Sequence, residues 1–150
     1  MIPCLRITDM NPRFLLFSLV LIGAGALGAD GLKPSEMKTK DALHTVINAQ
    51  LAAFRKDDYA GAYVFADRAI KDQFSPESFE RMVRNGFPAI AHSTSARCGL
   101  SFDNGDEAVV NVRVFSANRE PIDYQYALRR DGGDWRITGV TLLKDQTTEV

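Results

Sequence analysis

Two histidines and two cysteines are the side chains in this sequence best suited to nucleophilic or acid–base chemistry. The spacing of His44, His92 and Cys98 matches no zinc site. We interpret His44 as a boundary residue of a predicted helix. His92 is interpreted as an exposed loop residue, with the mouth of a pocket as the alternative. Cys98 alternates with small and polar residues, which is typical of a small buried hydrophobic side chain rather than a nucleophile.

The acidic residues that are neighbours in the sequence can be explained by structural roles. Asp57 and Asp58 could form an acid–base pair, but aspartate before a helix also caps it, and we prefer that interpretation. The run Asp103–Glu107 resembles a calcium loop only faintly, and its Asn-Gly pair predicts a hairpin turn. No phosphate-binding glycine loop or nucleophile elbow is present. The sequence therefore predicts no catalytic residue, no metal ligand and no cofactor.

Gln50 is the polar residue that carries most information. It lies within the apolar stripe of a predicted helix, where an unpaired amide costs about 1–3 kcal/mol. One interpretation is that Gln50 fixes the helix to a backbone group or to Tyr63. The other is a small amphipathic pocket in which polar groups orient a ligand. The ligand-binding residues of that pocket would be Gln50, Tyr63, Tyr126 and Trp135.

The charge balance argues against nucleic acid as a partner. The 150 residues contain 18 Lys and Arg against 19 Asp and Glu, a net charge of −1, with no basic tract. Proteins that bind nucleic acid through its phosphates need a concentrated positive surface. The 45% hydrophobic content is enough for one globular core.

The N-terminal segment has the pattern of a secretory signal peptide. Arg13 precedes an uncharged apolar run, Phe14–Gly28, which is shorter than the roughly 20 residues that span a bilayer. We expect residues 1–29 to be removed, Cys4 with them, although an uncleaved anchor is the alternative. Met10 is a second candidate start of translation. The protein is then periplasmic or secreted, free of the membrane after cleavage.

The residues after the predicted signal peptide show helical periodicity. Residues 30–40 are predicted to be a linker, and the next stripe, with a period of 3.6 residues, predicts a helix from about Asp41 to Arg55. The stripe consists of Leu43, Val46, Ile47, Gln50, Leu51 and Phe54. A second helix is expected from Tyr59 to about Ile70. A third begins at Ser75-Pro76, a serine cap followed by proline, and Pro88 prevents its continuation.

From about Ala96 the period changes to two, which predicts four antiparallel strands ending near Leu143. Turns are expected at Asp103–Asp106 and Asp131–Asp134, and Gly139 indicates a bulge or a close approach. The inward face is predicted to contain Cys98, Leu100, Phe102, Val110, Val112, Val114, Tyr124, Tyr126, Leu128, Trp135 and Ile137. This face has no Asp, Glu or His, which argues against an enzyme.

The outer face of the predicted sheet offers a possible homodimer interface. Its mixed polar residues surround one large aromatic ring, a composition that suits either a dimer or a solvated surface. The residues are Asn111, Arg113, Phe115, Gln125, Arg136 and Thr138.

The order of elements predicts an α+β fold, with N-terminal helices packed on a curved antiparallel four-stranded sheet. The single domain is expected to span residues 41–144, with a C-terminal tail at 145–150. This order resembles the nuclear transport factor 2-like, cystatin-like superfamily, in which helices fold into the concave side of a bent sheet to form a cone.

A closer resemblance, to the bacterial domain-of-unknown-function 4864 family, rests on the residues themselves. They are Val46–Phe54 (VINAQLAAF), Asp57-Asp58, Ala62–Ala66 (AYVFA), Phe79–Val83 (FERMV), Gly86–Pro88 (GFP) and Trp135–Val140 (WRITGV). The resemblance implies a fold and a secreted bacterial setting, and it brings no activity with it.

We therefore expect a module without catalysis that binds a small apolar or amphipathic ligand or associates with protein. The alternative is a small isomerase- or cyclase-type enzyme with its active site inside the cone. Its catalytic residue would be His92, or an aspartate that faces inward although the predicted strand alternation places it outside.

Overall fold

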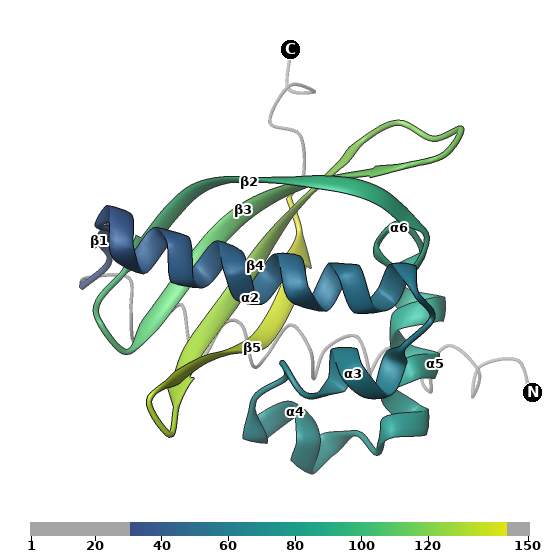
Figure 1. Cartoon of the computed structure of the whole chain (residues 1–150), viewed down its shortest axis with the longest axis horizontal. Helices are drawn as coiled ribbons and strands as arrows, with labels where there is room; N and C mark the ends of the chain where they lie inside the picture. The colour runs from purple at the N-terminus through teal and green to yellow at the C-terminus, as the bar shows by residue number, and fades with distance from the viewer. Residues whose placement is uncertain (1–30, 144–150) are drawn as a thin grey trace, which may run out of the picture.

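The computed structural model describes residues 31–143 and consists of a helical layer on one face of an antiparallel sheet (Figure 1). The helices are α2 (Met37–Arg55), α3 (Tyr59–Tyr63), α4 (Arg68–Gln73), α5 (Pro76–Gly86) and α6 (Pro88–Ala91). The strands are β1 (Lys33–Pro34), β2 (Ser93–Asp103), β3 (Glu107–Ser116), β4 (Ile122–Asp131) and β5 (Asp134–Leu142). The predicted α+β class is confirmed. The predicted signal peptide, Met10, Cys4 and the tail at 145–150 lie outside the described residues.

In the described part of the chain the open sheet has five strands in the order β1-β2-β3-β4-β5, so the predicted count of four is wrong. The additional strand is β1, where Lys33 pairs with Asp103 and Pro34 with Phe102. It lies in the segment predicted to be a linker. Two residues cannot show alternation, so β1 is defined by its pairing with β2 and has no sequence pattern of its own.

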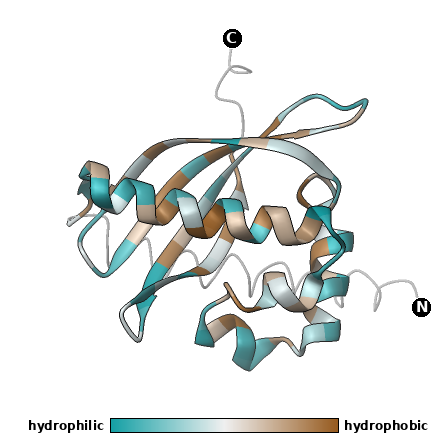
Figure 2. Cartoon of the chain, in the orientation of Figure 1, coloured by the Kyte–Doolittle hydropathy of each residue, from teal (hydrophilic) through white to brown (hydrophobic). Residues whose placement is uncertain are grey.

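Helix α2 packs its apolar stripe onto the sheet (Figure 1). It begins at Met37, earlier than the predicted Asp41. The buried positions are Leu43, Ile47, Gln50, Leu51 and Phe54, all members of the predicted stripe. Figure 2 shows hydrophobic residues concentrated in α2 and in the strands that it crosses. Within residues 31–143, no helix is both long and apolar enough to cross a membrane.

The predicted helix from Tyr59 to about Ile70 is two helices, and the prediction of one is wrong. Asp58 caps α3 as expected, accepting a hydrogen bond from the Gly61 N–H at 2.9 Å. The chain then leaves the helix because the edge of β5 competes for its backbone groups. The Ile137 N–H donates to the Phe65 carbonyl oxygen at 2.8 Å, and the Asp67 N–H donates to the Ile137 carbonyl oxygen at 2.9 Å. The Asp67 carboxylate then caps α4.

Helix α5 begins as predicted. The Ser75 hydroxyl accepts a hydrogen bond from the Ser78 N–H at 3.2 Å, and Pro76 occupies the first helical turn. Pro88 ends this helix and also starts α6, because proline suits a first turn, where its missing N–H costs nothing.

A bulge in β2 changes which residues face the helices. Cys98 lies opposite Val112, but the next pair joins Ser101 to Val110, so β2 contains one residue more than β3 there. The predicted inward position of Leu100 is wrong, since this side chain is 65% exposed. Phe102, also predicted to face inward, is only half-buried, whereas Ser101 is buried. The strand also begins at Ser93, before the predicted Ala96.

Strand β5 also contains a bulge, as Gly139 predicted. Ala127 pairs with Gly139 and Leu128 with Ile137, which leaves Thr138 as the extra residue. Thr138 is 1% exposed, so its predicted place on the outer surface is wrong. Both predicted turns are confirmed, with positive φ angles at Gly105 (+96°), Gly132 (+63°) and Gly133 (+92°), conformations that glycine adopts without strain.

Candidate functional site

A small cavity of about 30 Å³ lies between the helices and the sheet. A buried water needs roughly 10–15 Å³ by this measure, so the space admits about two water-sized groups. The lining residues are Gln50, Phe54, Ile70, Phe79, Met82, Val83, Phe87, Ile90, Tyr126, Ile137 and Val140. Gln50 and Tyr126 are the lining residues with an amide or a hydroxyl group, so any polar recognition in the cavity depends on them.

Gln50 reaches the cavity because it occupies one position of the buried stripe of α2. It is 4% exposed, and its Nε2 donates a hydrogen bond to the Ala62 carbonyl oxygen at 3.2 Å. This bond ties α2 to α3, in agreement with the interpretation that Gln50 fixes the helix to a backbone group. It is the single side-chain hydrogen bond of Gln50 within residues 31–143. An amide has two N–H donors and an acceptor oxygen, so Gln50 retains capacity for a further partner.

Tyr126 is the most deeply buried polar side chain of the site, with no exposed surface. Its hydroxyl oxygen has no hydrogen-bond partner in the described part of the chain. Burial raises the pKa of Tyr126 far above its usual range, so the phenol stays protonated and offers an O–H donor. Leaving such a group unpaired costs about 1–3 kcal/mol, which a small bound molecule would offset.

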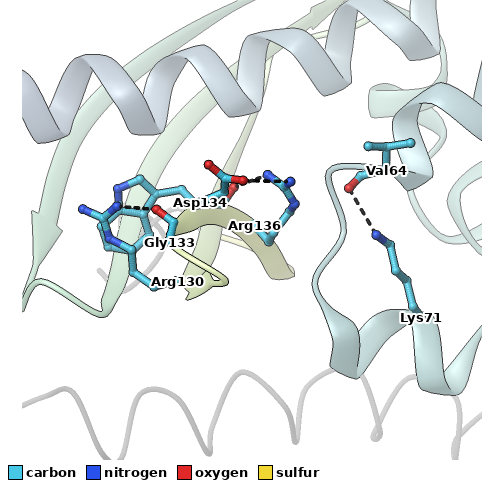
Figure 3. A network of polar contacts seen from close by, with 7 residues as sticks. Val64, Lys71, Arg130, Gly133, Asp134 and Arg136 are labelled. Carbon is cyan, nitrogen blue, oxygen red and sulfur yellow. Dashed lines mark hydrogen bonds and ion pairs between the residues drawn. The ribbon is translucent and has the colours of Figure 1, made fainter.

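The other two predicted site residues lie outside the cavity lining. The Tyr63 hydroxyl donates to the Phe74 carbonyl oxygen at 2.6 Å, which closes the segment after α4. Trp135 packs against Arg130, whose guanidinium carbon lies 4.4 Å from the centre of the indole ring system. Arg130 is held there by a hydrogen bond from Nη1 to the Gly133 carbonyl oxygen at 2.8 Å (Figure 3). The structure thus brings Gln50 and Tyr126 together and places Tyr63 and Trp135 elsewhere.

The apolar part of the lining was not predicted as a site. Met82, Phe87 and Ile90 come from α5, its C-terminal end and α6, and Met82 and Phe87 are half-buried. Their sequence signal was the apolar content on both sides of Gly86. That signal predicted helix packing and gave no indication of a cavity wall.

The histidines and the cysteine also lie away from this cavity lining. His92 follows α6 and is exposed, as predicted. His44 is half-buried, and its Nε2 lies 3.0 Å from the Ser101 hydroxyl that the β2 bulge turns inward. Burial raises the pKa of the Cys98 thiol to about 11, which keeps it protonated and agrees with its interpretation as a small hydrophobic residue. Among residues 31–143, no three His, Cys, Asp or Glu side chains are grouped so that they could hold a metal ion.

The half-buried environment of His44 predicts a pH dependence of stability. Desolvation, and secondly Lys40, lower the pKa of His44 below its ordinary value of 6.5, against a weaker opposing effect of Asp41. His44 therefore binds a proton more tightly in the unfolded chain than in the folded chain. As a result, the unfolding free energy decreases as the pH falls below 6.5. We expect the unfolding free energy of wild type to fall more between pH 7.5 and pH 5 than that of His44→Gln, as measured by urea denaturation.

The matched control is His92→Gln, which changes an exposed histidine. This variant should keep the full pH dependence of wild type. An equal pH dependence in wild type and His44→Gln would contradict the assignment to His44.

Comparison with known proteins gives a family and two distant structural likenesses. Residues 36–150 match the model of a domain of unknown function, DUF4864. Two similar solved structures are each 14% identical to this chain. One is a SEC-C motif containing protein from Rhodopseudomonas palustris, with a TM-score of 0.49, covering 66% of this chain and 77% of that chain. The other is Aln2 from a Streptomyces species, with a TM-score of 0.45, covering 75% of this chain and 95% of that chain.

The family match confirms the resemblance found in the sequence motifs. The two structures are too distant to bear on function, and the placement in the nuclear transport factor 2-like superfamily stays a prediction. The comparison with curated proteins gave no significant match.

Proposed function

Because this chain belongs to the DUF4864 family, whose domain is one of unknown function, we propose a function from the geometry of the cavity. The protein binds a small uncharged molecule, or the uncharged end group of a larger one, between its helices and its sheet. The observation that carries the proposal is the Tyr126 hydroxyl, which is fully buried without a partner in a residue that lines the cavity. Gln50 supplies the second polar contact.

The chemistry of the lining supports an uncharged ligand and binding without catalysis. None of the lining residues is Asp, Glu, His, Lys or Arg. A charged ligand would lose its hydration there without gaining an opposite charge, which is costly. Proton-transfer catalysis needs a titratable group near the substrate, and Tyr126 stays protonated. The alternative interpretation as an isomerase or cyclase relied on His92 or on an aspartate inside the cone. His92 is exposed, and neither His92 nor any aspartate is part of this lining.

The size of the cavity supports a small ligand or a small inserted end group. The volume of about 30 Å³ admits about two water-sized groups, such as a hydroxyl group and one carbon. A larger group requires movement of Met82 or Phe87, the half-buried lining residues. Methionine adapts readily to such a change because its side chain is unbranched and flexible. We further propose that binding takes place in the periplasm or outside the cell, because residues 1–29 have the pattern of a secretory leader.

Titration with short alcohols tests this proposal. We expect 1-propanol to shift the NMR signal of the Met82 methyl group in a saturable way, and propionate, its charged counterpart, to give no saturation. Tyr126→Phe removes one hydrogen bond and should weaken 1-propanol binding about tenfold, the equivalent of roughly 1.4 kcal/mol.

Tyr63→Phe is the matched control. It also removes one tyrosine hydroxyl, but one bonded to the Phe74 carbonyl oxygen outside the cavity lining. Its affinity for 1-propanol should equal that of wild type. The absence of saturable binding by ethanol, 1-propanol and 1-butanol would overturn the proposal.

A further inference from the structure

The cavity has one half-buried side, which is formed by Met82 of α5 and by Phe87, where α5 ends. The other lining residues are buried, so a ligand too large for the cavity has to extend past these two side chains. The centre of the Phe87 ring lies 6.1 Å from the centre of the Tyr124 ring on β4. The way out of the cavity past Phe87 therefore leads to the part of the sheet around Tyr124.

The sheet exposes a large apolar side chain at this place. Leu142 lies opposite Tyr124 in the pairing of β4 with β5, and Val140 lies two residues before it. Val140 in turn lies opposite Tyr126. Residues directly opposite each other share a face of the sheet, as do residues two positions apart in a strand. Leu142 is therefore on the face to which the cavity-lining Val140 and Tyr126 belong, and it is 57% exposed.

Half-buried Ile122 extends this apolar surface along β4. It pairs with Val114, a residue without exposed surface, two positions before the pair of Tyr124, so it lies on the same face. We refer to Phe87, Ile122, Tyr124 and Leu142 as the apolar strip. A single exposed leucine is common on protein surfaces. This one belongs to an uncharged strip that begins at the half-buried side of the cavity.

We propose that the ligand is an unbranched aliphatic molecule with a hydroxyl end group, whose alkyl chain lies along the apolar strip. This inference rests on the proposed function, because it takes the hydroxyl group to be bound beside Tyr126 and Gln50, and it adds the chemical class of the ligand. The cavity of about 30 Å³ admits the hydroxyl group and one carbon. The rest of the chain passes Met82 and Phe87 and covers Leu142.

The extent of the strip sets the length of the chain. Strand β5 advances about 7 Å from Val140 to Leu142, at about 3.4 Å per residue. With C–C bonds of about 1.5 Å, an extended alkyl chain covers this distance with about six carbons. One further carbon lies inside the cavity, so 1-heptanol is the shortest linear alcohol expected to reach the whole strip.

The affinity for linear alcohols should therefore increase with chain length. Burying one methylene group completely strengthens binding about fourfold, and covering it on one side does so about twofold. 1-Heptanol has four methylene groups more than 1-propanol. We expect its dissociation constant, measured from the Met82 methyl signal in NMR titrations, to be at least about tenfold lower.

4-Heptanol is the matched control compound. It has the same atoms as 1-heptanol, but its hydroxyl group is in the middle of the chain. It cannot place the hydroxyl group in the cavity and a single unbranched chain on the apolar strip. We expect it to bind no more tightly than 1-propanol.

Substitution of Leu142 tests the position of the chain. Leu142→Ser should raise the dissociation constant of 1-heptanol at least about threefold and leave that of 1-propanol unchanged, because 1-propanol is too short to reach this residue. Leu100→Ser is the matched control variant, since Leu100 is 65% exposed on β2, which is separated from β5 by two strands. It should bind both alcohols as wild type does. Saturation with 1-heptanol should also shift the methyl signals of Leu142 and not those of Leu100.

Tyr126→Phe tests the orientation of the ligand. With the hydroxyl group in the cavity, this variant should weaken the binding of 1-heptanol and of 1-propanol by the same factor, about tenfold. The opposite orientation, with the end of the chain in the cavity and the hydroxyl group in solvent, predicts no change for 1-heptanol.

Four results would overturn the inference. They are 1-heptanol binding no more tightly than 1-propanol, equal affinities for 1-heptanol and 4-heptanol, equal 1-heptanol affinities of Leu142→Ser and Leu100→Ser, and an unchanged 1-heptanol affinity in Tyr126→Phe. The second of these would indicate a general apolar surface. In each case saturable binding of 1-propanol is measured separately, so the proposed function stands. The absence of saturable binding by the short alcohols would overturn the proposed function and this inference with it.

Discussion

The Leu51→Ala variant is expected to lose about 2–5 kcal/mol of unfolding free energy, the range measured for leucine truncation in close-packed cores. Leu51 has no exposed surface and lies in the C-terminal half of α2, on the buried side of the helix. Its removal takes apolar atoms out of the core and leaves a void that the neighbouring strands fill only in part. Urea denaturation monitored by circular dichroism measures this loss.

Leu100→Ala is the control that uses the same substitution. Leu100 is 65% exposed on the β2 bulge, so its truncation should change stability by no more than about 0.5 kcal/mol. Strict alternation along β2 would instead place Leu100 in the core and predict a loss as large as that of Leu51. Similar losses in the two variants would therefore contradict the bulge.

The Asp67→Ala variant is expected to lose about 1–3 kcal/mol, because it leaves a buried backbone donor without its acceptor. Asp67 is 2% exposed, and its Oδ1 accepts a hydrogen bond from the Ile70 N–H at 3.1 Å. The same residue begins α4 directly after the contact with the edge of β5. We expect the loss of this cap to loosen α4, which should appear as faster hydrogen exchange at the Ile70 amide.

Asp67→Asn separates the cap from the charge. Asparagine caps helices about as well as aspartate, so this variant should keep most of the stability and the slow exchange at Ile70. Asp58→Ala removes the exposed cap of α3 and should cost less than Asp67→Ala. Equal stability of Asp67→Ala and wild type would show that the cap contributes nothing.

Helix stripes and turn residues were predicted correctly from the sequence because they depend on neighbours within a few positions. The buried face of α2 follows from spacing alone. The cap at Ser75 and the glycine turns between strands depend on single residues whose backbone preferences are local.

Only part of the candidate site could be predicted from local patterns. Gln50 and Tyr126 line the cavity because each occupies a regular position, one in a helical stripe and one in an alternating strand. Tyr63, the last residue of α3, lies outside the cavity lining, and its hydroxyl donates a hydrogen bond to the Phe74 carbonyl oxygen. Trp135 faces the helical side of the sheet, as alternation predicts, but its indole packs against Arg130, outside the cavity lining.

The sequence by itself determined that helices precede strands, which face of α2 is buried, and where the hairpins turn. Three features depended on the tertiary structure: the fifth strand, the division of one predicted helix into α3 and α4, and the bulges in β2 and β5. Each depends on backbone pairing between residues far apart in the chain, such as the hydrogen bonds of Ser35 with Ser101 and of Phe65 with Ile137. Local periodicity contains no information about such partners. The cavity that Tyr126 lines is therefore a property of the folded chain.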